Sequence, residues 1–106
     1  MLGWGVPTFD SHYIFNYLLH TNGGSRGSWN PTGFSNADVD AMIVSLESET
    51  DLAVRDATIA KIWDIVQSEQ VHLPIHNQVL NWGMSEGINF DVQPEDQPHF
   101  QFLTFN

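Results

Sequence analysis

Two apolar stripes with helical spacing, separated by only a few residues, constrain the fold of this chain more than any other feature. Asn36 is a favoured helix-capping residue, and the apolar positions after it follow an i, i+3, i+4, i+7 pattern at Val39, Met42, Ile43 and Leu46. Thr50 or Asp51 caps a second run that extends to about Gln67 and repeats this spacing at Ile59, Ile62, Trp63 and Val66. Because the connection is short, we expect an antiparallel helical hairpin.

A short helix and a long loop are expected before this hairpin. Asp10 or Ser11 caps the helix, which runs to about His20 with one apolar side formed by Ile14, Phe15, Leu18 and Leu19. Residues 21–35 are rich in Gly, Ser, Asn and Pro, so they predict a loop, and a loop of this length is usually functional or flexible. We expect its two aromatic residues, Trp29 and Phe34, to anchor it.

Segments with strand character flank the helical region. Residues 2–6 are short, apolar and bounded by Pro7, which suits a buried strand. Apolar and polar residues alternate over 71–76, although Pro74 restricts that strand to a sheet edge or to a short stretch. Further extended segments are predicted at 79–84 and 100–105, around an irregular acidic stretch at 87–98. The order indicates a mixed α/β fold with a helical hairpin between strands, in which the first strand has no obvious partner.

Composition excludes several classes of function. The chain has 106 residues, enough for one domain, and only three Lys and Arg side chains oppose 13 carboxylates for a net charge of -10. Such a surface repels nucleic acid and anionic lipid. The absence of cysteine excludes disulfides, zinc–thiolate sites and thiol nucleophiles. No signal peptide or membrane span is recognisable, which by itself indicates a cytosolic protein.

The polar residues do not form a recognisable catalytic or metal-binding pattern. His72 and His76 on an extended segment would lie about 13 Å apart, too far to share an ion. Ser11 and His12 are adjacent, and neighbours in sequence rarely face each other as nucleophile and base. We therefore expect no enzyme activity, no metal site and no cofactor. The run 3–5, Gly-Trp-Gly, permits close approach of backbone to a ligand, but the residues alone favour a plain buried strand end.

Several stretches, taken in order, resemble a known family. Gly3-Trp4 is followed six residues later by Asp10, residues 30–40 read NPTGFSNADVD, an acidic turn at 49–51 precedes Arg55, and residues 72–76 read HLPIH. In order and spacing the whole chain resembles the C-terminal part of the bacterial extracellular solute-binding proteins of family 5, the periplasmic peptide-binding type.

The resemblance implies a longer, two-lobed parent protein with a type II periplasmic-binding fold. Residues 1–70 would belong to its C-terminal lobe, and residues 71–106 would hold the strands that cross back toward the N-terminal lobe. The parent would be exported, with its signal peptide outside this chain, and would bind peptides or a related small solute in the periplasm. Its partners would be the ligand, the ABC permease subunits and the missing N-terminal part of the same protein.

The resemblance also implies which residues line the ligand cleft: Trp4, Gly5, Val6, Pro7, Thr8, Phe9 and Trp29. Peptide-binding members hold the peptide's amino group with an Asp at the position of Pro7, and Pro has no carboxylate. We therefore expect a ligand other than a free peptide amino terminus, such as a modified peptide, a sugar, an opine-like compound or a metal chelate. We expect Trp82 to pack in a core. The main alternative is a small acidic interaction domain with no role in transport.

Overall fold

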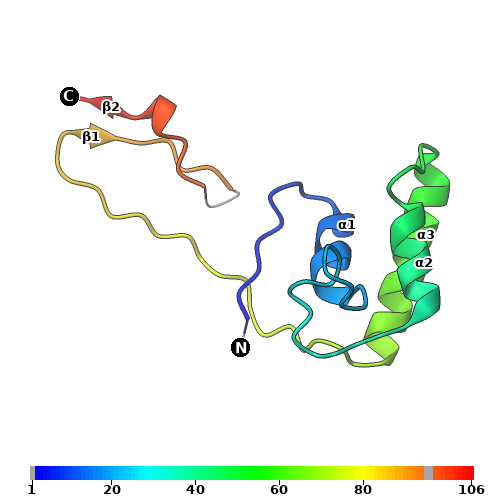
Figure 1. The fold of residues 1–106 in the computed structure, drawn as a ribbon. Coiled ribbons are helices and arrows are strands. Elements are labelled where there is room, and N and C mark those ends of the chain that lie inside the picture. Colours follow the sequence, from blue (N-terminus) through cyan, green and yellow to red (C-terminus); the bar gives the residue numbers. More distant parts are fainter. Residues whose placement is uncertain (1, 95–96) are drawn as a thin grey trace. The chain divides into compact units, whose positions relative to one another are not determined.

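Helix α1, at Ser11–Ile14, continues into a short π-helical segment, η1, at Phe15–Leu19 (Figure 1). The structure, a computed structural model, describes residues 2–94 and 97–106. Asp10 caps α1 as predicted, because its Oδ1 atom accepts the backbone N–H of His12 at 2.7 Å. The expected helix to about His20 is confirmed, but its second half has the wider π turn, in which the His20 N–H donates to the Phe15 carbonyl at 2.9 Å.

Residues 21–35 form the expected loop, which folds back on η1. The N–H groups of Gly27 and Trp29 donate to the carbonyls of Asn16 and Tyr17, at 2.8 and 3.1 Å. These carbonyls lie near the end of the helical segment, where helix carbonyls need partners from outside the helix. Trp29 does not anchor the loop through burial, because the residue is 61% exposed. Backbone hydrogen bonds and the Asn30 side chain hold the loop instead.

The helical hairpin is confirmed. Helix α2 spans Ala37–Ser45 with Asn36 as its cap, and α3 spans Leu52–Ser68 with Asp51 as its cap. The two helices run antiparallel (Figure 1). Their apolar faces pack with η1 into one core, and the Phe15 and Trp63 rings meet edge to face at 4.9 Å. The buried apolar residues are Phe15, Leu18, Leu19, Val39, Ile43, Leu46, Ile62 and Val66.

Residues 8–74, which hold all of these helices, form one compact unit, and the described residues on either side of that stretch form a second. In the second unit β1, Ile88–Asn89, pairs antiparallel with β2, Thr104–Phe105, so that Ile88 lies opposite Phe105. The short 3-10 helix η2 spans Phe100–Phe102. Among the described residues, no helix is both long and apolar enough to cross a membrane.

The strands predicted at 2–6, 71–76 and 79–84 are not formed. Residues 2–6 and 71–84 join no ladder in the described part of the chain. Alternating apolar residues stabilise a strand only when a neighbouring strand takes up its backbone hydrogen bonds. The prediction that Trp82 packs in a core is wrong as well: its side chain is 38% exposed, and its ring lies 5.7 Å from that of Phe90.

Candidate functional site

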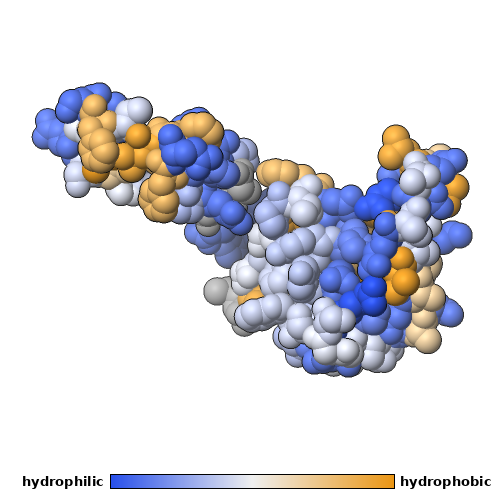
Figure 2. All heavy atoms as spheres, turned by 45° about the horizontal axis from the view of Figure 1, so that its top comes forward, coloured by the Kyte–Doolittle hydropathy of each residue, from blue (hydrophilic) through white to orange (hydrophobic). Residues whose placement is uncertain are grey.

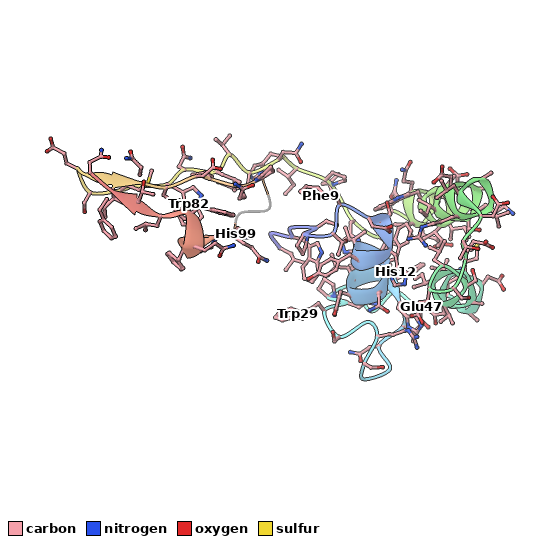
Figure 3. All side chains as sticks on the ribbon, turned by 90° about the horizontal axis from the view of Figure 1, so that it is seen from above. Phe9, His12, Trp29, Glu47, Trp82 and His99 are labelled. Atoms are coloured by element: carbon pink, nitrogen blue, oxygen red, sulfur yellow. The ribbon has the colours of Figure 1, made fainter. Side chains whose placement is uncertain are left out.

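The residues predicted to line a ligand cleft are divided between the two units. Trp4, Gly5, Val6 and Pro7 belong to the second unit, whereas Thr8, Phe9 and Trp29 belong to the compact unit. Phe9 is 73% exposed and has a φ of 54°, a left-handed conformation that is uncommon outside glycine. Figure 3 shows the Phe9 and Trp29 side chains apart, on different sides of the ribbon of α1 and η1. The structure therefore does not bring these two aromatic residues together.

Thr8 lines a hollow on the compact unit, hereafter the α1 hollow. Its volume is about 380 Å³, which falls within the range of small-molecule sites. The other lining residues come from the cap of α1, from α1 and η1, and from α3: Asp10, His12, Tyr13, Asn16, Tyr17 and Arg55. His12 and Asn16, like Tyr13 and Tyr17, are four residues apart, so both pairs recur on one side of the helical segment. The two tyrosine rings lie 4.9 Å apart.

Arg55 fixes the wall of the α1 hollow at Asp10. Its Nη2 atom donates to Asp10 Oδ2 and its Nη1 atom donates to the Leu46 carbonyl, both at 2.6 Å. The hydrogen bond from the His12 N–H is the main cause that lowers the pKa of the Asp10 carboxyl; burial opposes it, and the hydrogen bond and charge of Arg55 lower the pKa further. The Asp10 carboxylate is therefore ionised at neutral pH and already holds a cationic partner.

A second ion pair lies near the hollow. Arg26 donates to Glu47 Oε1 through Nη2 at 2.7 Å and through Nε at 3.2 Å. The Arg26 hydrogen bonds lower the pKa of Glu47. His12 Nε2 lies 3.9 Å from the same Glu47 oxygen, and Figure 3 shows these two side chains close together. The carboxylates of Asp10 and Glu47 thus each have an arginine partner within the compact unit.

Two polar atoms of the lining residues make no hydrogen bond within the described part of the chain. Asn16 Oδ1 and His12 Nε2 are both shielded from water. Leaving a buried polar atom unbonded costs free energy, typically about 1–3 kcal/mol, so such atoms are uncommon in folded proteins and call for an explanation. Sequence analysis considered His12 only as a partner of Ser11 and did not consider Asn16. Their i, i+4 spacing places both on one side of the helical segment, but such spacing alone does not indicate a site.

Ser11, which is adjacent to His12 in sequence, bonds elsewhere in the compact unit. Ser11 Oγ accepts a hydrogen bond from the Trp63 indole at 3.4 Å, so the serine hydroxyl is engaged with the core rather than with His12. Within residues 2–94 and 97–106, no three His, Asp or Glu side chains cluster closely enough to hold a metal ion. Comparisons of the chain with protein-family models, curated proteins and solved structures gave no match.

Proposed function

We propose that this chain is the C-terminal part of the solute-binding component of an ABC importer, a periplasmic protein that binds peptides or a related small solute and delivers it to a permease. The ordered resemblance of the Gly3-Trp4, 30–40, 49–55 and 72–76 segments to solute-binding proteins of family 5 supports this proposal.

The exposure of the extended segments is the observation that carries the proposal. Apolar side chains that alternate in sequence over 71–84 are largely open to solvent: Leu73 is 85%, Ile75 69% and Val79 71% exposed. Figure 2 shows further hydrophobic side chains at the surface of the second unit. Exposed apolar patches of this kind mark surfaces that another part of a protein covers. Strands that cross between the lobes of a larger binding protein would have this character.

The α1 hollow adds a physical basis for binding a solute. Small-molecule sites combine an apolar, aromatic lining with a few polar groups that orient the ligand. Tyr13 and Tyr17 provide the aromatic lining, and the polar groups come from Asn16, His12 and Asp10. In a two-lobed parent such a site would couple to hinge closure, because closure follows from contacts that the ligand makes only in the closed form.

The test is the intact mass and location of the native product. An antibody raised against the 106-residue chain would detect the product in periplasmic and cytosolic extracts of the source cell, and mass spectrometry would measure it. We expect a periplasmic species several times heavier than 12.0 kDa with a processed N-terminus. A 12.0 kDa species confined to the cytosol would overturn the transport proposal and leave the small acidic interaction domain.

A further inference from the structure

We propose that Asn22 is a modification site, at which the side-chain amide is hydrolysed to a carboxylate through a ring formed with the backbone of Gly23. Of the asparagines in the chain, Asn22 alone precedes a glycine. Both residues are exposed and lie in the loop that joins η1 to α2. The reaction consumes water as its one co-reactant, and it does not depend on the transport role proposed above.

The chemical step is an intramolecular acyl substitution. The backbone nitrogen of Gly23 loses its proton and attacks Cγ of Asn22, so that a new N–Cγ bond forms, the bond from Cγ to the side-chain nitrogen breaks and ammonia leaves. Water then opens the resulting five-membered succinimide at either of its carbonyl carbons, which gives isoaspartate or aspartate. Nothing is oxidised or reduced, because the sum is an amide and water going to a carboxylic acid and ammonia. Ionisation of the new acid adds a negative charge to a chain whose net charge is -10.

Glycine at position 23 favours this ring closure. The attacking nitrogen must approach Cγ closely, and glycine has no side chain to obstruct the approach and adopts more backbone conformations than other residues. The Gly23 N–H donates to the Arg26 carbonyl at 3.1 Å, so this hydrogen bond has to open before the nitrogen can react. Exposed loops open locally at little cost in free energy. The fold therefore slows the reaction at Asn22 without preventing it.

Comparison with the other asparagines separates the effect of the glycine from that of exposure. Asn77 is the counterpart of Asn22, because both residues are exposed and neither side chain makes a hydrogen bond among the described residues. Asn77 precedes Gln78, whose side chain hinders the approach of the backbone nitrogen. Other asparagines have a buried side-chain atom or engage in side-chain hydrogen bonds: Asn16, Asn30, Asn36, Asn81 and Asn89.

The surrounding structure tolerates the product. The Thr21 N–H donates to Asp40 Oδ1 at 2.9 Å, and the Gly27 N–H donates to the Asn16 carbonyl at 2.8 Å. Asn22 lies between these two anchored positions, in an exposed turn outside the core. Isoaspartate lengthens the backbone by a methylene group, and the turn takes up this extra length while both anchors stay in place. The modified chain therefore keeps its fold and gains a charge.

The test is incubation of the folded 106-residue chain at mildly alkaline pH, followed by digestion with trypsin and tandem mass spectrometry. Cleavage after Arg26, Arg55 and Lys61 separates Asn22, in residues 1–26, from Asn77, in residues 62–106. We expect Asn22 to lose its amide at least about tenfold faster than Asn77, and faster still in urea. A rate at Asn22 no higher than that at Asn77, or conversion in urea alone, would overturn the proposal.

Gly23→Ala tests the ring closure itself. A Cβ atom at this position would meet only the Thr21 carbonyl oxygen, at 3.8 Å, so we expect the variant to fold with an unchanged melting temperature. Its rate at Asn22 should fall to about that at Asn77. Gly83→Ala is the matched control, because a Cβ atom there would meet nothing within 4 Å, and it should leave the rate at Asn22 unchanged. A rate at Asn22 that Gly23→Ala does not lower would rule out attack by the backbone nitrogen.

Discussion

Arg55 and Asp10, 45 residues apart in sequence, are joined by a hydrogen bond of 2.6 Å between Nη2 and Oδ2. The second guanidinium nitrogen of Arg55 donates to the Leu46 carbonyl at the end of α2, also at 2.6 Å. One side chain on α3 therefore ties the cap of α1 to the end of α2. It holds together the three helical elements that surround the core and fixes one wall of the α1 hollow.

Arg55→Met should therefore destabilise the compact unit. The variant keeps most of the aliphatic stem but removes both hydrogen bonds, and we expect a loss of about 1–3 kcal/mol in the free energy of unfolding. Solvent screening at the partly exposed Asp10 carboxylate argues for the lower half of that range. Urea unfolding followed by tryptophan fluorescence measures it. Lys61→Met on the exposed face of the same helix is the control, and an equal loss in both variants would contradict this role for Arg55.

Gly27 and Gly33 differ in why the loop has glycine at each position. Both residues have positive φ angles, 64° at Gly27 and 70° at Gly33. A Cβ atom at Gly27 would collide with the His20 carbonyl oxygen and would lie 2.7 Å from the Thr21 carbonyl oxygen. A Cβ atom at Gly33 would meet no atom within 4 Å. We expect Gly33→Ala to cost only the left-handed backbone conformation, about 1–2 kcal/mol. Gly27→Ala adds overpacking and should cost about 2–5 kcal/mol in all. Thermal unfolding compares them, and equal costs would rule out the close approach at Gly27.

Asn30 stabilises the loop that carries Trp29. Its amide nitrogen donates to the carbonyls of His20 and Phe34 at 3.1 and 2.8 Å, and its oxygen accepts from the Thr32 N–H, the Thr32 hydroxyl and the Gly33 N–H. We expect Asn30→Ala to cost about 1–3 kcal/mol, because two part-buried carbonyls lose their donors.

Asn30→Asp provides the internal comparison, since it keeps the three accepted bonds and loses only the two donated ones. Its cost should fall between those of the unchanged chain and Asn30→Ala. Hydrogen exchange should show faster exchange at the amides of residues 27–34 in both variants, with the helical hairpin protected as before. Unchanged exchange in Asn30→Ala would mean that the backbone alone holds the loop.

The sequence predicts the parts of this fold that depend on local chemistry. Asp10, Asn36 and Asp51 cap their helices as expected, because a short polar side chain at a helix start bonds N–H groups two or three residues ahead. The apolar spacing at Val39 and Ile43 also identifies the buried face correctly. These signals lie within a few residues of the feature they determine.

Features that depend on distant partners were not predictable in the same way. The alternation at 71–76 is a strand signal, but it forms a strand only beside another one. The α1 hollow needs Arg55 to meet Asp10, and the loop needs Gly27 to meet Asn16, which no local pattern specifies. The i, i+4 spacing of His12 with Asn16 and of Tyr13 with Tyr17 places each pair on one side of the helix, but it does not indicate that a hollow forms there.

The stability of the compact unit should fall in acid. The pKa of Asp10 in the folded chain lies below its ordinary value of 3.8, so the unfolded chain takes up the proton first as pH falls. The contribution of the ionised carboxylate is therefore complete well above pH 3.8 and is lost as pH falls through the lowered folded value. Arg55 and the His12 N–H are the groups that hold the ionised form.

Melting temperatures of the unchanged chain and of Asp10→Asn from pH 7 to pH 2 measure this contribution. The unchanged chain should melt higher near neutrality, and the two curves should converge in acid. A difference that stays constant with pH would show that the charge of Asp10 does not stabilise the unit. Glu47→Gln should also lower the melting temperature near neutrality. High salt should abolish this difference, because the Arg26–Glu47 pair is solvent-exposed and therefore screened.

Pro7→Asp in the proposed two-lobed parent tests the assignment of the ligand cleft. The family resemblance places a carboxylate for a peptide's amino terminus at this position, and Pro7 cannot provide one. If residues 4–9 line the cleft, the new carboxylate should create or strengthen binding of peptides with a free amino terminus and leave N-acetylated peptides unaffected. Calorimetry with trialanine and N-acetyl-trialanine measures the difference. An unchanged ligand profile would remove residues 4–9 from the cleft.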